Sequence, residues 1–304
     1  MISLKQIQYA LAIEKTLHFK KAADVCNVSQ STLSSAINEL EKQLGVQLFE
    51  RNNKQVLITV EGHEILRRAK IIKTELDEIM QLSQRDSQPL SGSMTLGVIP
   101  TIGPYLLPKV LPKIRHDFPN FKLSIIEEQS HTLVERVRAG EIDAAILAMP
   151  FDISGLIKFD FWEEDFYWVA HKDESPKNRH EVRSSELDAN KLMLLRDGHC
   201  LKRHTLAACQ LQDTKKDSSF EGTSLYTLIQ MVLGKLGSTI VPQMALDQLL
   251  GQETELRAIH LNEPGPHRTI SLVIRPHYVR TNEVVLLKDI FSQQLKLKCQ
   301  NTET

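Results

Sequence analysis

Residues 29–45 constrain the fold more than any other stretch, because their apolar residues recur at intervals of four, three and four. That spacing places one apolar stripe along a helix, which must pack against other parts of the chain. The stripe consists of Leu33, Ile37, Leu40 and Leu44. Ser29 can cap this helix, and Gly45 is the residue type that commonly ends one. A shorter helix over residues 19–26 and a tight turn complete a predicted helix-turn-helix, and a capping box at Ser3 and Gln6 predicts an earlier helix.

The opposite face of the capped helix carries short polar side chains that can approach base edges in the major groove of DNA. These are Gln30, Ser31, Thr32, Ser34, Ser35 and Asn38. Residues 48–58 predict a hairpin, the wing of a winged helix, where Arg51 and Lys54 can contact phosphates or the minor groove. Any small three-helix domain also has polar outer faces, so the pattern alone leaves a purely structural role open.

The charges separate along the chain, although its net charge is only -1. Residues 1–73 hold eleven Lys or Arg against seven Asp or Glu, which makes +4, and the rest of the chain carries −5. A basic reader of nucleic acid joined to an acidic domain is therefore expected. The 304 residues, 41% hydrophobic and without a membrane-length apolar run or a signal-peptide pattern, predict a cytoplasmic, multidomain, water-soluble protein.

Residues 59–84 predict one long helix with an a/d seam of about three heptads, the signature of a two-stranded coiled coil. The seam consists of Ile65, Ala69, Ile72, Leu76 and Ile79. The alternative is a stripe buried against its own domain, but the adjoining domain is too small to cover it. A dimer is therefore favoured, and a dimer suits paired DNA half-sites. The turn-rich residues 86–93 predict a hinge.

Beyond the hinge, short apolar strands alternate with helices, and residues 94–148 form a βαβαβ series that predicts a parallel sheet covered by helices on both faces. Strands are expected at 94–98, 122–127, 144–148, 166–171, 191–195, 218–221, 239–241 and 268–275, and helices at 104–116, 131–139, from 224 and from 281. Two α/β lobes with the chain crossing between them indicate a periplasmic-binding-protein type of architecture. The expected domains are a winged helix-turn-helix (1–58), a dimerisation linker helix (59–88) and a regulatory domain (89–304), with lobe I at about 89–163 and 268–304 and lobe II at about 164–267.

Hydroxyl side chains follow several of the predicted strands, where open α/β sheets bind ligands. They are Thr101, Ser130, Thr223 and Ser224. Each of them can equally cap a helix. Several hydroxyls facing one crevice nevertheless favour a site for a small polar ligand.

Cys200 and Cys209 lie at the two ends of a short predicted helix. Basic residue types surround the first thiol and are expected to lower its pKa, which favours the thiolate that attacks peroxide. They are His199, Lys202, Arg203 and His204. Nine helical steps separate the cysteines by about 13.5 Å, whereas a disulfide needs Cα atoms within ~7 Å. A bond between them therefore requires the helix to unwind, as in a redox switch, whereas Cys26 and Cys299 are expected to be inert.

Zinc binding by these cysteines with His199 and His204 is a weaker interpretation, because the spacing lacks a CxxC or HxxxH clamp. The chain also has no P-loop, HExxH, GxSxG or GxGxxG motif. No metal, no cofactor and no enzymatic activity are therefore expected.

A family resemblance covers the whole chain. Residues 19–51, FKKAADVCNVSQSTLSSAINELEKQLGVQLFER, closely resemble the winged helix of LysR-type transcriptional regulators. Within that family, GVIPTIGPYLLP at 97–108, DGHCL at 197–201 and the second cysteine at 209 resemble the hydrogen-peroxide-sensing activators of the OxyR type.

This resemblance implies that peroxide oxidises Cys200 to a sulfenic acid, which Cys209 captures as a disulfide. It implies a peroxide site formed by Thr101, Ser130, His199 and Lys202, with Phe220 near the switch segment and Arg268 in the next layer of contacts. It also implies tetramers that bind double-stranded promoter DNA, contact RNA polymerase and are reset by a glutaredoxin- or thioredoxin-type reductant.

Three positions depart from the family pattern: Ser130 stands for Thr, Lys202 for Arg, and Ser219 for His. The first two keep the hydroxyl and the charge, so sensing is expected to survive with an altered reactivity or reversal rate. Two other functions stay open. One is a LysR-type regulator with an organic effector between the lobes and incidental cysteines. The other is a thiol peroxidase, in which the DNA reader has no role.

Overall fold

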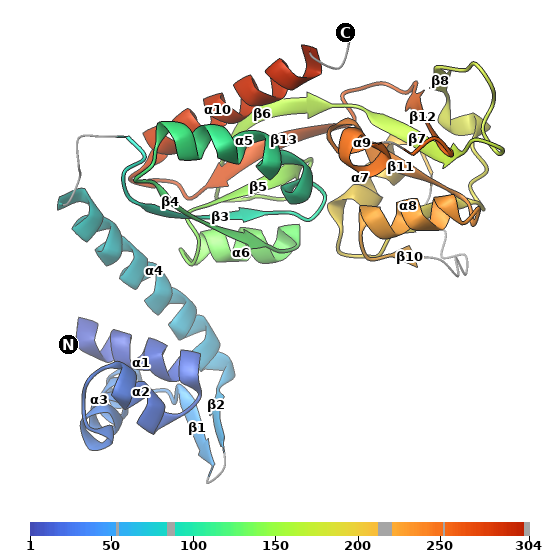
Figure 1. Cartoon of the computed structure of the whole chain (residues 1–304). Coiled ribbons are helices and arrows are strands. Elements are labelled where there is room, and N and C mark those ends of the chain that lie inside the picture. Colours follow the sequence, from blue (N-terminus) through green and yellow to red (C-terminus); the bar gives the residue numbers. More distant parts are fainter. Residues whose placement is uncertain (53–54, 84–88, 212–220, 252, 301–304) are drawn as a thin grey trace. The chain divides into compact units, whose positions relative to one another are not determined.

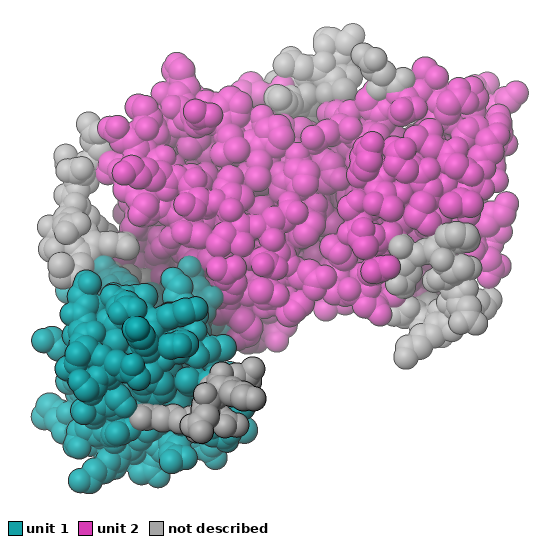
Figure 2. Space-filling model, turned by 60° about the horizontal axis from the view of Figure 1, so that its bottom comes forward, with its two compact units in different colours: residues 1–85, 138–141 teal, residues 86–137, 142–304 magenta. Residues whose placement is uncertain are grey.

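The computed structural model describes residues 1–52, 55–83, 89–211, 221–251 and 253–300 (Figure 1). They fall into two compact units (Figure 2). The first unit covers residues 1–85 and 138–141, and the second covers 86–137 and 142–304.

The first unit begins with helices and a hairpin, and local capping contacts fix ends of the helices. The elements are α1 (Leu4–Thr16), α2 (Phe19–Val25), α3 (Gln30–Leu44), β1 (Phe49–Asn52) and β2 (Gln55–Ile58). The Ser3 backbone N–H donates to Gln6 Oε1 at 2.8 Å while Ser3 Oγ accepts from the Gln6 N–H at 3.3 Å. Ser29 Oγ accepts from the Thr32 N–H at 3.1 Å, and Gly45 ends α3 with φ 71°. The capping box, the N-cap and the helix end predicted from sequence are confirmed.

The apolar stripe of α3 forms the core of this unit. Leu33, Ile37 and Leu40 are at most 3% exposed, and they share one cluster with Ala22 and Ala23 of α2. Leu44 is half-buried at the edge of this cluster. The hairpin follows the helices, as expected for a wing, and its tip residues 53–54 lie outside the described part of the chain.

Helix α4 (Val60–Ser83) carries the predicted seam, but the exposure of the seam residues differs along the helix. Leu66 joins the core of the first unit and Ala69 is buried, so the start of the helix is partly covered by its own domain. Further along, Ile72 and Ile79 are 43% and 60% exposed. The C-terminal half of the seam therefore presents exposed apolar residues that a partner helix could cover.

The second unit contains two sheets, each with helices packed on it (Figure 1). Lobe I has the strand order β4-β3-β5-β13-β6. Its strands are β3 (Ser93–Val98), β4 (Lys122–Glu127), β5 (Ala144–Met149), β6 (Ile157–Glu164) and β13 (Arg268–Ile274). Its helices are α5 (Gly103–Asp117), α6 (Ser130–Arg138) and α10 (Thr281–Gln300), with α5 and α10 on one face and α6 on the other.

Lobe II has the strand order β10-β9-β11-β7-β12-β8. Its strands are β7 (Phe166–His171), β8 (Glu181–Val182), β9 (Leu192–Leu195), β10 (Glu221–Gly222), β11 (Ser238–Pro242) and β12 (Leu256–Leu261). Its helices are a 3-10 turn (Ser184–Glu186), α7 (Cys200–Ala208), α8 (Leu225–Leu233) and α9 (Gln243–Leu250). One continuous hydrophobic cluster runs through both lobes.

The parallel sheet predicted from the βαβαβ series is confirmed for β3, β4 and β5, but both sheets also contain antiparallel strands. β3 is parallel to both β4 and β5, but β13 is antiparallel to β5 and β6, and β7 is antiparallel to β11 and β12. The reason is the double crossing: the chain leaves lobe I along β6 and returns along β13, so these two strands run in opposite directions side by side. The sequence pattern predicted neither β6 nor β12.

Candidate functional site

The outer face of α3 presents the polar residues predicted to read DNA. Gln30, Ser31, Thr32, Ser35 and Asn38 are exposed and Ser34 is half-buried. The hydroxyls of Ser31 and Thr32 both lie 2.8 Å from Ser29 Oγ, so the start of α3 is internally ordered. Arg51 lies on β1, but its side chain and all of Lys54 lie outside the described residues, so their contact with DNA stays a prediction.

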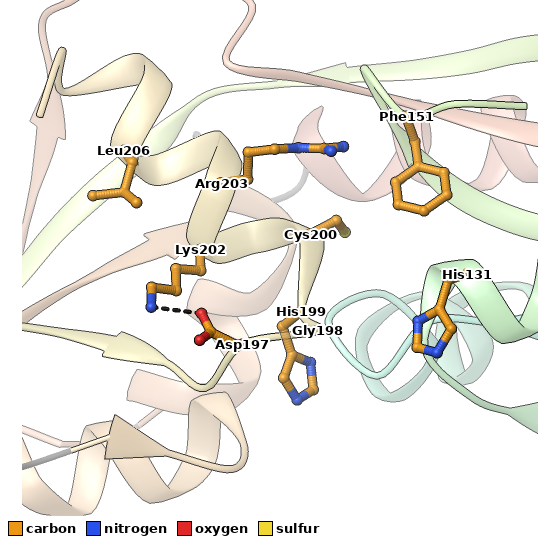
Figure 3. Close-up of a pocket in the computed structure, with 9 residues that line it drawn as sticks. All are labelled: His131, Phe151, Asp197, Gly198, His199, Cys200, Lys202, Arg203 and Leu206. Carbon is orange, nitrogen blue, oxygen red and sulfur yellow. Dashed lines mark hydrogen bonds and ion pairs between the residues drawn. The ribbon is translucent and has the colours of Figure 1, made fainter. Parts of the chain in front are cut away.

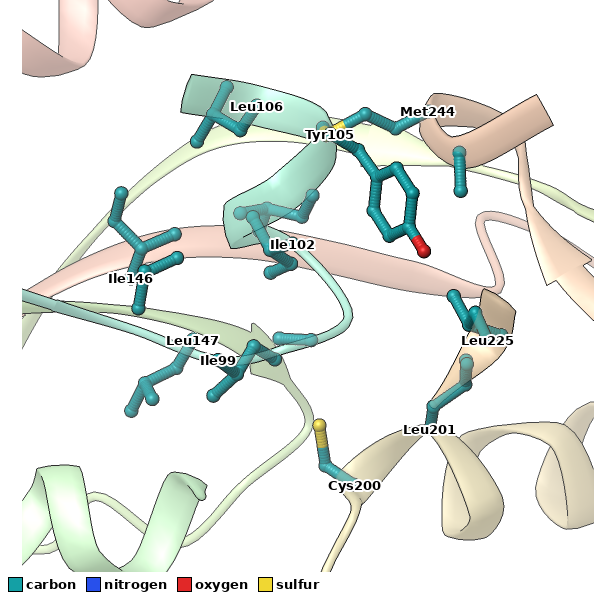
Figure 4. Close-up of a cluster of buried hydrophobic side chains, with 14 of the residues drawn as sticks. Ile99, Ile102, Tyr105, Leu106, Ile146, Leu147, Cys200, Leu201, Leu225 and Met244 are labelled. Carbon is teal, nitrogen blue, oxygen red and sulfur yellow. The ribbon is translucent and has the colours of Figure 1, made fainter. Parts of the chain in front are cut away.

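The second site is built around α7, which begins at Cys200 and has Cys209 as its C-cap residue. Both thiols are unpaired, and both residues are buried, at 6% and 3% exposed. Cys200 lies at the edge of the apolar cluster that contains Ile99, Leu201 and Leu225 (Figure 4). Since the helix is regular over this stretch, the two cysteines are about 13.5 Å apart along its axis.

Burial controls the protonation of Cys200. Burial raises the pKa of this thiol above its ordinary value, while Ser130 and the charges of Arg268 and Arg203 lower it by less. Burial also raises the pKa of Cys209, to about 11. The expected depression of the Cys200 pKa was therefore wrong for the resting structure, in which the protonated thiol is favoured.

Of the basic neighbours named from sequence, Arg203 lowers this pKa, whereas Lys202, His199 and His204 do not, for identifiable reasons. Lys202 Nζ is 2.7 Å from Asp197 Oδ1, so its charge is already paired. Burial lowers the pKa of His199, and lowers that of His204 to about 4, so both rings favour the neutral form at pH 7. A sequence lists the residue types around a thiol, but only the fold determines which of them keep a charge near it.

Thr101, Ser130 and Arg268 come together on the lobe I side of Cys200. Arg268 donates to Thr101 Oγ1 at 3.3 Å and to the Thr101 carbonyl at 3.2 Å. Its Nε donates to Glu164 Oε1 at 2.6 Å, and both side chains of this ion pair are 0% exposed. Ser130, 1% exposed, lies close enough to Cys200 to lower the thiol's pKa, yet its Oγ makes no hydrogen bond of ordinary geometry to a described group.

A pocket of about 390 Å³ opens beside Cys200, between residues of both lobes (Figure 3). It is lined by His131, Phe151, Asp197, Gly198, His199, Cys200, Lys202, Arg203 and Leu206. His131 and Phe151 were missed from sequence. His131 directly follows the predicted Ser130, which is a usable signal, whereas nothing local marks Phe151 because it reaches the pocket from a loop of lobe I.

Gly198 fits this site only as glycine. Its φ is 96°, a left-handed conformation that side chains rarely adopt. A Cβ there would also lie 2.6 Å from Oε1 of Gln129, which lobe I contributes. The loop before Cys200 is therefore fitted closely against lobe I.

The other predicted pocket residues are placed elsewhere. Ser224 Oγ accepts from the Thr227 N–H at 3.1 Å and caps α8, and Thr223 is exposed, so neither lines this pocket. Here the capping role, the alternative left open from sequence, is the one observed for Ser224. Phe220 and Ser219 lie outside the described residues.

Among the described residues, no group of three or more His, Cys, Asp or Glu side chains is arranged to hold a metal ion. In the same part of the chain, no helix is both long enough and apolar enough to span a membrane.

Two family models match this chain. Residues 4–63 match the bacterial regulatory helix-turn-helix protein, lysR family, and residues 87–296 match the LysR substrate binding domain. The chain belongs to the LysR family of bacterial transcriptional regulators. LysR proteins are DNA-binding regulators of transcription, and the winged helix-turn-helix and the two-lobed α/β domain are the parts expected from the resemblance.

Individual LysR relatives are similar over nearly the whole chain. The HTH-type transcriptional regulator EstR of Acinetobacter baylyi is 37% identical over 292 residues, 96% of each chain. The transcriptional dual regulator OxyR of Escherichia coli K12 is 33% identical over 277 residues, 90% of each. A full-length OxyR structure from Pseudomonas aeruginosa superposes with a TM-score of 0.80 at 30% identity, covering 96% of this chain and 95% of that one.

Proposed function

We propose that this LysR regulator is a transcriptional activator that senses hydrogen peroxide through Cys200 and a reversible Cys200–Cys209 disulfide. One observation carries the proposal: two buried, unpaired cysteines occupy the two ends of one short helix, and the first lies close to Ser130 and to Arg268, which bonds to Thr101. Relatives named hydrogen peroxide-inducible genes activators, 34% identical over 275 residues in Dickeya chrysanthemi, support it.

The proposed chemistry balances without a cofactor. The Cys200 thiolate attacks one peroxide oxygen, the O–O bond breaks, and a sulfenic acid and hydroxide form; a proton then converts the hydroxide to water. The Cys209 thiol attacks the sulfenic sulfur, releasing a second water and forming the disulfide. A dithiol reductant of the glutaredoxin or thioredoxin type returns the pair to thiols.

The surroundings of Cys200 suit selective rather than general reactivity. Because burial favours the protonated thiol, bulk oxidants meet an unreactive group. The Ser130 hydroxyl and the charge of Arg268 lower the pKa of the thiol, so they favour the thiolate when peroxide reaches this side of the site. The hydroxyls of Thr101 and Ser130 are the proposed groups that orient the peroxide, with His199 and Lys202 in the lining of the adjacent pocket.

The test compares peroxide responses of the full chain. We expect Cys200 to oxidise first during a peroxide titration followed by thiol mapping. Cys200→Ser is expected to abolish the peroxide response of a promoter, and footprints of reduced and oxidised protein are expected to differ on the same DNA. Cys26→Ser, which alters a thiol in the first unit, is the matched control and should respond normally. A normal response from Cys200→Ser would reject the proposal.

A second candidate function is a response to a small organic effector in the pocket of Figure 3. The pocket volume of about 390 Å³ is far larger than hydrogen peroxide requires, since one water molecule occupies about 30 Å³. The relative EstR also carries no reference to peroxide in its name. Under this alternative, Cys200→Ser remains regulated by an organic effector. Binding of that effector protects His131 and Phe151 from chemical labelling or perturbs their spectra.

The assembly completes the proposal. We infer that exposed Ile72 and Ile79 pair two copies through α4, placing two α3 helices on paired half-sites of promoter DNA. Association of the regulatory domains into tetramers and contact with RNA polymerase belong to the same proposal.

A further inference from the structure

Two residues of the switch helix α7 make hydrogen-bond contacts with the same carbonyl oxygen of lobe I. Arg203 Nη2 donates to the Pro150 carbonyl at 2.8 Å, and His204 Nε2 lies 3.0 Å from the same oxygen. A carbonyl only accepts hydrogen bonds, so the proton of the His204 ring resides on Nε2. Two consecutive residues of lobe II thus converge on the residue that follows β5 of lobe I.

Both donors are held in place by further contacts. His204 is 2% exposed, and its burial lowers its pKa to about 4, so the neutral ring has one N–H and commits it to Pro150. The Arg203 guanidinium lies 5.3 Å from the centroid of the Phe151 ring, next to Pro150, which adds a cation–π contact (Figure 3). His204 is the better shielded donor, since Arg203 is exposed.

These contacts oppose any rearrangement of α7. His204 lies four residues after Cys200 and five before Cys209, within the segment that must unwind before the two Cα atoms can approach within ~7 Å. While Arg203 and His204 remain bonded to Pro150, the middle of α7 is held against lobe I, which opposes the approach of the two cysteines. The hydrogen bonds to Pro150 therefore stabilise the dithiol conformation, in which α7 is helical.

We propose that Arg203, His204 and the Pro150 carbonyl form a latch that holds α7 in the dithiol state and sets how readily the Cys200–Cys209 disulfide forms. The inference rests on the proposed function and adds positioning residues to it. A net hydrogen bond changes an equilibrium by about two- to tenfold. Loss of one donor should shift the dithiol–disulfide equilibrium towards the disulfide by that factor, and a tenfold shift corresponds to about 30 mV.

The test uses full-length protein equilibrated in glutathione redox buffers, where oxidation of the dithiol consumes one glutathione disulfide and releases two glutathione thiols. His204→Phe removes the N–H and keeps a ring of similar bulk, and Arg203→Met removes the exposed donor with little risk to folding. The fraction of disulfide is measured by alkylation and mass spectrometry. We expect both variants to reach half disulfide when the concentration of glutathione disulfide, divided by the squared concentration of reduced glutathione, is two- to tenfold lower than for the unaltered chain.

Two controls separate the latch from general loosening of α7. His204→Gln retains a side-chain N–H donor, and Ala207→Gln changes an exposed position of the same helix; both should stay within twofold of the unaltered chain. Equal equilibria for His204→Phe, Arg203→Met and the unaltered chain would overturn the latch and leave peroxide sensing intact. Failure of the unaltered chain to form the disulfide at all would overturn both proposals together.

Discussion

His204 shows how strongly burial controls single residues in this protein. The free imidazole has an ordinary pKa of 6.5, and burial lowers it to about 4, with the charges of Arg268 and Arg203 acting in the same direction. The same effect raises the pKa values of Cys200 and Cys209. At this scale burial favours the neutral forms of Cys200, Cys209 and His204, which a count of basic residues near Cys200 did not predict.

This depressed pKa makes stability depend on pH in a definite direction. A group with a lowered folded-state pKa contributes stability above its unfolded value, near pH 6.5, and that stability is lost as the pH falls through about 4. The loss expected for full protonation of His204 is on the order of 3 kcal/mol. Urea unfolding at pH 7 and at pH 4 measures it, with His204→Gln as the non-titrating reference. Parallel pH profiles for the two proteins would contradict the assignment.

At the scale of elements, the helix caps and the apolar stripe of α3 form as predicted from local sequence. Ser3, Ser29 and Gly45 define helix ends through contacts with residues no more than four positions away. Helix α4 differs, because its start packs on the first unit while its later apolar residues remain exposed. An exposed apolar stripe on a long helix favours self-association, since it removes those side chains from water.

We expect Ile79→Glu to weaken dimerisation at least tenfold, because it places an unpaired charge in the predicted seam. Sedimentation equilibrium of the full chain gives the dissociation constant. Glu75→Gln, a change to an exposed residue of α4 outside the seam, is the comparison and should leave the constant unaltered. An unchanged dissociation constant for Ile79→Glu would show that α4 does not pair two copies.

At the scale of the whole regulatory unit, two chain crossings hold the lobes together. Arg268 and Glu164 are register partners where β13 meets β6, and their ion pair is fully buried at these crossings. Glu164 Oε2 also accepts from the Met244 N–H at 2.8 Å, which ties in α9 of lobe II. Through its bonds to Thr101, Arg268 connects this hinge to the surroundings of Cys200.

Arg268→Met should destabilise this unit by about 3–5 kcal/mol, because it leaves the Glu164 carboxylate buried without its partner. Trp162 and Trp168 both lie in this unit, so their fluorescence during urea denaturation reports its unfolding. Adding Glu164→Gln to Arg268→Met removes the orphaned charge and should recover part of the loss. A cost below about 1 kcal/mol for the single change would contradict a stabilising role for the pair.

Much of the candidate site could be predicted from sequence, and the residues that were missed reach it from distant parts of the chain. The cysteine pair, Thr101 and Ser130 follow strand ends or flank a short helix, which are local signals. Phe151 and Pro150 reach α7 from the other lobe, and the bond from Arg203 spans 53 positions in the chain. Arg268, expected in the next layer of contacts, bonds to Thr101 across 167 positions of the chain.

The sequence by itself determined helix ends, the apolar stripe of α3, the alternation of strands and helices, and the spacing of Cys200 and Cys209. These depend on residues that are neighbours in the chain, so local periodicity and capping chemistry suffice. The tertiary structure alone decided the strand directions around β13, the neutral state of Cys200, His199 and His204, and the attachment of α7 to Pro150. Strand pairing, desolvation and hydrogen bonding act between segments that only folding brings together.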